Sequence, residues 1–483
     1  MSHLGTILTA SLALYAFVTA VFLISENRRP QSTLAWMLAF FVAPGIGVLI
    51  YLLFGRNRKA FSKQSKLLRQ DLEANARPLL SPVLSRQDKE IARLEGESAS
   101  RRRLMKLVRD NSDSVLTTRN HVRIQQDATT FYPSLIEDMK TARRSIHLQY
   151  FIWGADRFTK RLKEILIAKA IEGVEVRLLY DPLGSYFHLN RAYIRELQAA
   201  GVKMAPTSPL YRLHTISYRN HRKITVIDGT IGYTGGMNIG KEHLDGGRGF
   251  ESWRDTQLRI VGEGAGVLQA VFIVDWHNAA RENLFSDAYF PMDATEPADN
   301  DMPVQILTSG PDSRWAAIRQ LYASMITTAQ RHVFLQSPYF IPDATIAEAL
   351  RTAALAGVDV RVMLSAQPSG NRLPDWAGNT YIADIVAAGV RVFLYRKGYL
   401  HAKTISIDSE ICSIGSANID IRSFSINYEL NAVLYSKRLA TELEQDFERD
   451  LAHCTEFDAA EYENRNVVAR FRDSVARLLS PLL

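Results

Sequence analysis

Two short stretches of the chain share one pattern of a histidine, a lysine and an aspartate, H-x-K-x4-D. The first copy contains His221, Lys223 and Asp228, and the second contains His401, Lys403 and Asp408. Each copy continues after its aspartate with x6-G-[GS]-x-N, which ends in Asn238 in the first copy and in Asn418 in the second. Two copies with the same extension are too similar to arise by chance. The repetition predicts one site that draws on both copies.

These residue types suit the transfer of a phosphoryl group. Lysine supplies fixed positive charge and the asparagine amide supplies donors, which together balance charge on the oxygens of a phosphodiester as it becomes five-coordinate. One imidazole can attack phosphorus and form a phosphohistidine. The other can protonate the departing alkoxide and then deprotonate the incoming hydroxyl. The near symmetry of the two copies leaves the assignment of the attacking histidine open.

Four carboxylates accompany the pattern. A catalytic histidine needs a carboxylate or a carbonyl behind its ring to set its tautomer and orientation. The stretches 253–260 and 427–434 align with Asp255 opposite Glu429, and we expect each carboxylate to orient the histidine of its own half; the alternative is that both are surface carboxylates on strands. Asp228 and Asp408 fall at turns after a strand, so we expect them to support the loops of the site.

The elements that must position these residues are themselves duplicated. Residues 145–156 correspond to 332–343, 171–180 to 355–364, and 199–204 to 387–395. Each copy alternates short β-branched strands with amphipathic helical stretches, which predicts two homologous α/β domains with mixed sheets. Two such domains in one chain pack about a pseudo-twofold axis, which would bring both H-x-K strands to one cleft.

The N-terminal part of the chain predicts a membrane anchor. Leu4–Ile24 and Leu34–Phe54 are uncharged runs, each long enough to cross about 30 Å of hydrocarbon. The first run lacks the basic flank of a cleaved signal peptide. The connector holds Arg28 and Arg29, whereas the segment after the second run is far more basic, and this bias places the rest of the chain in the cytoplasm. A net charge of +7 and a pI near 9.2 also indicate an anionic partner, and the two spans favour a membrane over nucleic acid.

The sequence therefore predicts four segments. They are two transmembrane helices in 1–55, a basic helical juxtamembrane linker in 56–118, a first α/β domain in 119–300, and a second α/β domain with a C-terminal helix in 301–483. The C-terminal stretch places Val468, Phe471, Val475, Leu478 and Leu479 at helical spacing with arginines between them. It fits a helix on a membrane surface and equally a helix docked on the protein's own core. The two cysteines, Cys412 and Cys454, show no metal or disulfide spacing.

The duplicated motif resembles the signature of the phospholipase D superfamily, and the chain as a whole resembles the bacterial cardiolipin synthases of that superfamily. The likeness also includes RRPQSTLAW, APGIGVLIYLLFGR, SGPDSRWAAI, SPYFIPD, GYLHAKT and LLSPLL. Residues 366–381 depart from the family pattern. The resemblance implies two phospholipase D-like domains in a multi-pass protein of the bacterial inner membrane. It also implies phosphatidyl transfer between two phosphatidylglycerol molecules, giving cardiolipin and glycerol without a metal, nucleotide or other cofactor, with His221 as the attacking group and His401 as the acid and base.

Two other activities use the same residues. A phospholipase D that hydrolyses phospholipid to phosphatidic acid differs only in admitting water, and a phosphodiester nuclease would keep both histidines. We expect phosphatidylglycerol and anionic membrane lipids as partners and no nucleic acid, because a nuclease has little use for two spans and a basic juxtamembrane segment. The oligomeric state is not indicated by the sequence.

Overall fold

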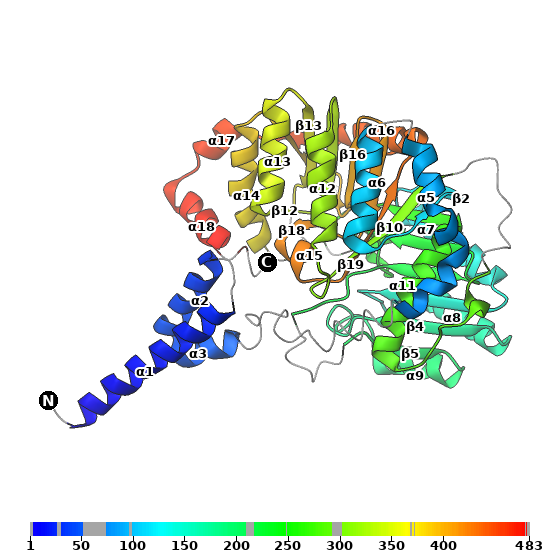
Figure 1. Cartoon of the computed structure of the whole chain (residues 1–483), viewed down its shortest axis with the longest axis horizontal. Coiled ribbons are helices and arrows are strands. Elements are labelled where there is room, and N and C mark those ends of the chain that lie inside the picture. Colours follow the sequence, from blue (N-terminus) through cyan, green and yellow to red (C-terminus); the bar gives the residue numbers. More distant parts are fainter. Residues whose placement is uncertain are drawn as a thin grey trace.

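The computed structural model describes residues 3–26, 30–51, 74–95, 99–208, 217–247, 249–291, 302–367, 370, 372–478 and 480. Within these residues the chain forms two large mixed β-sheets covered by helices, with a small group of helices at the N-terminal end (Figure 1).

The first sheet has seven strands. Their order is β2 (Asn120–Gln125), β9 (Gln257–Gly262), β7 (Ile231–Gly235), β6 (Ile224–Ile227), β3 (Ser145–Tyr150), β4 (Glu175–Tyr180) and β5 (Lys203–Pro206). β3, β4 and β5 are parallel and the remaining pairs are antiparallel. The parallel strands are joined by α8 (Arg157–Ile171) and α9 (Arg191–Ala199), which pack with α7 (Ala128–Thr141) on one face, while α11 (Glu263–Ala280) covers the other.

The second sheet repeats this order and adds a strand at each edge. Its strands run β1 (Leu116–Thr117), β10 (Val304–Ser309), β19 (Glu429–Leu434), β17 (Ile411–Gly415), β16 (Thr404–Ile407), β11 (His332–Ser337), β13 (Asp359–Ser365), β14 (Arg391–Tyr395) and β20 (Cys454–Glu456). Helices α12 (Ala317–Thr328), α13 (Ala344–Leu355) and α14 (Leu373–Val386) cover one face, and α16 (Lys437–Leu451) packs on the other. The seven inner strands match the first sheet one for one, so the predicted duplication of an α/β unit is confirmed.

Local sequence explains why matching elements form in both halves. β6 and β16 are short β-branched runs in which every residue is buried. The helices that follow β3 and β11 begin at matching aspartates: Asp156 accepts the backbone N–H of Thr159, and Asp343 accepts that of Ile346. An aspartate at this position satisfies a backbone donor that the first helical turn leaves unpaired.

The two halves share one apolar core. A single cluster of buried side chains contains Ile224 and Leu258 from the first sheet, Ile414 and Leu430 from the second, and Phe272 from α11. Burying apolar surface between the sheets stabilises their association. The site is therefore built on one body.

The predicted linker of residues 56–118 is part of that body wherever the structure describes it. The helices are η2 (Arg77–Leu80), α5 (Ser81–Glu95) and α6 (Ala99–Ser112). Leu104 and Val108 of α6 are fully buried in the core of the second half, and β1 extends the second sheet through its pairing with β10. The basic residues at 56–69 lie outside the described residues.

The N-terminal segment is helical, but its second predicted span is divided. The helices are α1 (His3–Ser25), α2 (Pro30–Val42) and α3 (Pro44–Ile50). The break at Ala43 has a physical reason: Pro44 lacks the N–H that would continue the hydrogen-bond ladder of α2. Among the residues that can be described, no helix has both the length and the apolar character that crossing a membrane requires.

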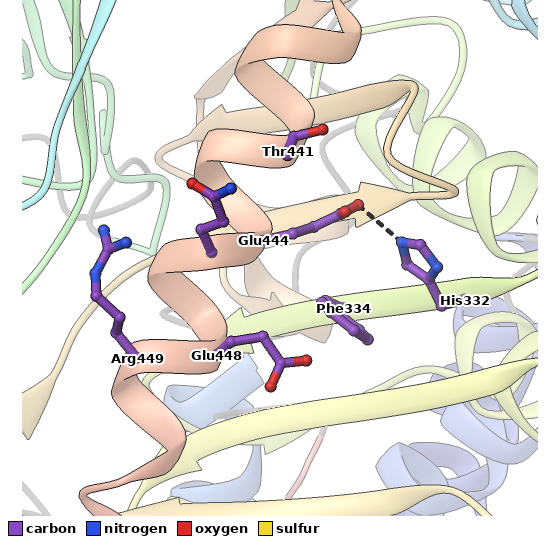
Figure 2. A pocket seen from close by; sticks show the side chains of 7 residues that line it. His332, Phe334, Thr441, Glu444, Glu448 and Arg449 are labelled. Atoms are coloured by element: carbon purple, nitrogen blue, oxygen red, sulfur yellow. Dashed lines mark hydrogen bonds and ion pairs between the residues drawn. The ribbon is translucent and has the colours of Figure 1, made fainter.

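A groove of about 390 Å³ lies between α16 and β11 (Figure 2). There the ring of His332 lies 2.9 Å from Oε1 of Glu444, which also accepts the backbone N–H of Ser409. His332 begins β11, whereas the H-x-K blocks lie beyond the other end of that strand. The groove is thus remote from the histidine and lysine pairs.

Candidate active site

Each H-x-K block lies on an extended segment that pairs with the opposite half of the molecule. The backbone N–H of His221 donates to the carbonyl of Tyr428 at 2.9 Å, and that of His401 donates to the carbonyl of Arg254 at 2.7 Å. Next to His401, β8 (Trp253–Arg254) and β15 (Tyr399–Leu400) form a parallel two-stranded sheet between the halves. The main chain therefore holds each histidine against the other half.

The carboxylates behind the two histidines also come from the opposite half. Nδ1 of His221 lies 3.1 Å from Oε2 of Glu429, and Nδ1 of His401 lies 2.6 Å from Oδ2 of Asp255. Both carboxylates are fully buried. Our expectation that each would serve the histidine of its own half was wrong, because the crossed pairing exchanges the partners. The alternative that Asp255 and Glu429 are surface carboxylates is also excluded.

The second contacts of the two carboxylates differ. The hydroxyl of Ser416 donates to Oε2 of Glu429 at 2.5 Å. The backbone N–H of Thr256 donates to Oδ1 of Asp255 at 2.8 Å. At the position equivalent to Ser416 the first half has Gly236, where a Cβ atom would meet Oδ1 of Asp255 at 2.0 Å. The position of the Asp255 carboxylate therefore requires that residue 236 has no side chain.

Burial and charge set the protonation of these pairs. Burial opposes ionisation of Glu429, but the positive charges of His221 and Lys223 and the hydrogen bonds from His221 and Ser416 hold its pKa below the ordinary value. Burial raises the pKa of Asp255. Burial lowers the pKa of His221, partly offset by Glu429. Burial and the charges of both lysines lower the pKa of His401 well below its usual range.

The two lysines are buried close to the histidines. Nζ of Lys223 donates to the carbonyl of His221 at 2.5 Å, and Nζ of Lys403 donates to the carbonyl of His401. Burial lowers the pKa of Lys223 to about 7 and that of Lys403 to about 8. An anion between them would favour their charged forms. The site is therefore suited to a phosphodiester.

The two asparagines border the same region. Oδ1 of Asn238 accepts the backbone N–H of Ile152 at 3.2 Å. Nδ2 of Asn418 donates to the hydroxyl of Tyr339 at 2.9 Å, while its buried Oδ1 has no hydrogen-bond partner among the described residues. Both asparagines are buried, and they follow β7 and β17 at the end where the histidines lie.

Asp228 and Asp408 lie elsewhere. Each adopts a positive φ at the turn after β6 or β16. Asp228 accepts the backbone N–H groups of residues 143–145, and Asp408 those of residues 330–332, at 2.7 to 3.1 Å. With strand β6 between them, Asp228 lies roughly 15 Å along the chain from Lys223. These contacts hold the segments that precede β3 and β11, at the end of each sheet away from the histidines. Our expectation that the two aspartates support the loops of the site was therefore wrong, and neither of them contacts a histidine or lysine of the motif within the described residues.

The sequence of the chain matches two protein-family models and several known proteins. The family model of the cardiolipin synthase, phospholipase D-like domain matches residues 135–252 and 322–451, and that of the phospholipase D-nuclease N-terminal segment matches 11–56. The chain is 38% identical to the cardiolipin synthase of Oceanobacillus iheyensis, over 99% of this chain and 98% of that one. It is 37% identical to the major cardiolipin synthase ClsA of Bacillus subtilis over the whole of both chains.

The chain belongs to the cardiolipin synthase family. Its fold is also similar to the crystal structure of phosphatidylserine synthase from Haemophilus influenzae, with a TM-score of 0.61 and 14% identity, covering 79% of this chain and 100% of that one. At this level of identity the likeness concerns the fold alone.

This cardiolipin synthase family member holds a third imidazole that sequence reasoning missed. Nε2 of His243 accepts the backbone N–H of Asn238 at 3.2 Å, so the ring proton is on Nδ1, which is buried without a partner among the described residues. The rings of His243 and His401 have centroids 6.1 Å apart, and burial lowers the pKa of His243 to about 3. In the second half Ser423 takes this place, since its hydroxyl accepts the backbone N–H of Asn418. A histidine five residues after Asn238 was the available signal.

Proposed function

We propose that this cardiolipin synthase transfers a phosphatidyl group from one phosphatidylglycerol to another, with cardiolipin and glycerol as products. The crossed histidine and carboxylate pairs, with two buried lysines beside them, are the observation that carries the proposal. Similarity over almost the whole length to curated cardiolipin synthases supports it.

In the first step, Nε2 of His221 attacks the phosphorus of phosphatidylglycerol. The bond from phosphorus to the headgroup glycerol oxygen breaks, and His401 gives a proton to that oxygen, which leaves as glycerol. Burial and the two lysines disfavour the protonated form of His401 in the free protein, and the negative charge of the bound phosphodiester favours it in the complex. In the second step, the headgroup hydroxyl of another phosphatidylglycerol attacks phosphorus, His401 takes its proton, and the phosphorus–nitrogen bond breaks. His221 and His401 return to their starting states, so the exchange is reversible and needs no net proton.

The contacts of the site support these assignments. The Nδ1 of His221 faces a carboxylate whose pKa is held low, which stabilises the positive ring in the intermediate. The Nδ1 of His401 faces Asp255. Lys223 and Lys403 supply positive charge for the phosphoryl oxygens, and we assign Asn238 and Asn418 to the binding of the same group. Asp228 and Asp408 contribute at a distance, by tying the turns after β6 and β16 to the starts of β3 and β11 at the opposite end of the sheets.

We place the protein in the bacterial inner membrane, with residues 1–55 as a multi-pass anchor and the two domains on the cytoplasmic side. The match of residues 11–56 to the N-terminal family model supports an anchor of the family type. The excess of Lys and Arg after residue 55 supports the orientation. Phosphatidylglycerol and other anionic lipids are then its partners.

The decisive experiment is product analysis with the purified full-length protein in phosphatidylglycerol vesicles without added metal or nucleotide. We expect equal amounts of cardiolipin and glycerol, and loss of both in His221→Ala and His401→Ala. His453→Ala is the control, since His453 is exposed and outside the site. Phosphatidic acid as the sole lipid product would identify a hydrolase, and turnover that survives in either variant at its full rate would overturn the assignment of that histidine.

The covalent intermediate can be tested separately. Phosphatidylglycerol labelled in its phosphate should leave label on the denatured protein, and the bond should be stable to base and labile to acid, as a phosphoramidate is. We expect His401→Ala to retain some label and His221→Ala to retain none. The opposite pattern would exchange the roles of the two histidines.

A further inference from the structure

The C-terminal helix α18 (Val467–Leu478) presents its apolar face to solvent. Val468, Phe471 and Leu478 are 78%, 69% and 78% exposed, and Val467 and Val475 are exposed on the same side. Residues spaced by three and four positions share one face of a helix, so these side chains form a continuous stripe.

The opposite face of α18 is the one that docks on the protein, and its central contact is polar. Asp473 is fully buried and accepts hydrogen bonds from Nδ2 of Asn379 at 3.0 Å and from the guanidinium of Arg465 at 3.1 Å. Ala476 packs with Ala377 of α14 and with Ile341. The helix is thus held without its large apolar side chains.

The orientation of α18 is the reverse of the usual orientation of a surface helix. A surface helix of a globular protein turns its apolar stripe toward the core and its charged residues toward water. A contiguous apolar patch with a polar border marks an interaction site. Arg470 lies next to the stripe in the helix, and Asp473 is the only acidic residue of the helix. Arg472 and Arg477 are half-exposed at its edge and pair with Asp473 and Asp384. An apolar stripe with basic flanks is suited to the surface of an anionic bilayer.

The helix lies close to one wall of the active site. α18 packs along α14, and α14 packs on β12 (Phe340–Ile341) (Figure 1). β12 pairs with β18 (Ile419–Asp420), which directly follows Asn418. The hydroxyl of Tyr339, the residue before β12, contacts the side chain of Asn418. The exposed apolar face of α18 therefore lies near the wall of the active site that carries Asn418, one of the two residues assigned to phosphate binding.

A second exposed apolar group borders the other wall. In the loop after β4, Phe187 is 89% exposed, and Leu183 and Tyr186 are exposed with it. This loop packs on Phe151 through Gly184, and the ring of Phe151 contacts that of His221 at 5.0 Å. Strand β4 of the first half matches β13 of the second half. The loop at 183–187 comes after β4, and α14 comes after β13. Both halves thus expose apolar residues at the end of the sheet where the histidines lie.

We propose that the apolar face of α18 and the tip of the loop at 183–187 insert into the headgroup region of an anionic bilayer and hold the mouth of the active site against it. The proposal deepens the proposed function, because a lipid substrate that reaches the site from the bilayer need not cross water. It assigns a role to the C-terminal helix that is separate from anchoring by residues 1–55.

The test uses the full-length protein in a Cys454→Ser background, since Cys412 is buried. A single cysteine is introduced at Phe471→Cys or Phe187→Cys, with Thr441→Cys on the exposed side of α16 as the control, and is labelled with an environment-sensitive fluorophore. Vesicles of phosphatidylglycerol and phosphatidylcholine carry a quencher on the acyl chain. We expect a blue shift and at least about twofold quenching at positions 471 and 187, and neither effect at position 441.

Further variants separate the outcomes. His221→Ala added to Phe471→Cys should be quenched as strongly, because docking does not need turnover, so an error in the assigned chemistry would leave this result unchanged. Replacing Val468 and Val475 by Asn should reduce the quenching at position 471, with an unchanged circular dichroism spectrum as the test of folding. Equal fluorescence at positions 471 and 441 in vesicles would overturn the proposal. A disulfide crosslink between two copies of the Phe471→Cys variant, without quenching, would also overturn it and would assign the face to a second copy of the chain.

Discussion

The two histidine pairs of the site are built alike but are not equivalent. His221 is paired with a glutamate backed by the hydroxyl of Ser416, whereas His401 is paired with an aspartate backed by Gly236. The side chain of aspartate is one methylene shorter than that of glutamate. Gly236, which has no Cβ atom, leaves room for the carboxylate of Asp255. In each half the carboxylate and the residue behind it therefore form one unit, and a change in one member requires a change in the other.

The pairs also differ in charge. The pKa of Glu429 is held low by the surrounding positive groups and hydrogen bonds, while burial raises the pKa of Asp255. An ionised partner stabilises a histidine that becomes positive when it attacks phosphorus. This difference favours His221 as the nucleophile and leaves the proton transfers to His401.

The largest effects are expected from neutralising the carboxylates. Glu429→Gln and Asp255→Asn should each reduce kcat by about 10³- to 10⁴-fold, because the wrong tautomer of the histidine is favoured. A phosphatidyl ester with a nitrophenol leaving group, which needs no proton, should restore the first step in Asp255→Asn and not in Glu429→Gln. Release of nitrophenol in a burst measures that step. If Glu429→Gln were the restored variant, His221 would be the proton donor and His401 the nucleophile.

The residues behind the carboxylates should give the next largest effect. Gly236→Ala places a methyl group against Oδ1 of Asp255 and should lower kcat by about 10²-fold, since a displacement of about 1 Å at the site has that effect. Ser416→Ala removes one hydrogen bond to Glu429 and should lower it by about tenfold. Initial rates on mixed vesicles measure both. Equal losses would mean that both pairs tolerate an alanine behind the carboxylate equally well. That result would contradict the matching of glycine with aspartate and of serine with glutamate.

The two buried lysines, one in each half, predict that KM depends on pH. In the free protein the pKa values of Lys223 and Lys403 are about 7 and about 8, below those of exposed lysines. A bound phosphodiester raises both values, so binding takes up protons. KM should therefore rise by up to about tenfold per pH unit above pH 7 through Lys223, and by up to about a further tenfold per pH unit above pH 8 through Lys403. Measurement of KM from pH 6 to 9 tests this. Lys223→Arg, which stays charged, should flatten the rise, and a KM that is constant in the native chain would contradict it.

The smallest effect is expected at the residue that most clearly breaks the symmetry. His243→Ala removes the acceptor for the N–H of Asn238 and should lower kcat by about three- to tenfold, which corresponds to one neutral hydrogen bond. His243→Ser installs the residue that the second half uses there and should recover most of the loss. Ser423→Ala is the matched change in the other half. A loss in His243→Ser as large as in His243→Ala would show that the imidazole itself is required.

The sequence was informative wherever the determinants are local. The repeated strands, the alternation of strands with helices and the two H-x-K blocks all follow from short stretches that can be compared within the chain, and the matching sheets confirm them. The turn chemistry of Asp228 and Asp408 likewise predicted that both lie at turns, but it did not show that these turns lie at the end of the sheets away from the site.

The crossed pairing was not predictable in this way. Aligning the halves shows that Asp255 and Glu429 are equivalent, but it contains nothing about which histidine each one meets, since that depends on the packing of one half against the other. The same limit applies to α18. Its spacing shows an apolar stripe, but the docked face is decided by the contact of Asp473 with Asn379, which is 94 residues away.

The exchange of carboxylates between the halves makes each half depend on the other for its chemistry. Half of this chain contains one sheet with its own histidine and lysine, but it holds no complete histidine and carboxylate pair. Two copies of such a half, facing one another, would complete two pairs at once. The duplication therefore keeps both members of each pair in one molecule, so that neither pair depends on the encounter of two chains.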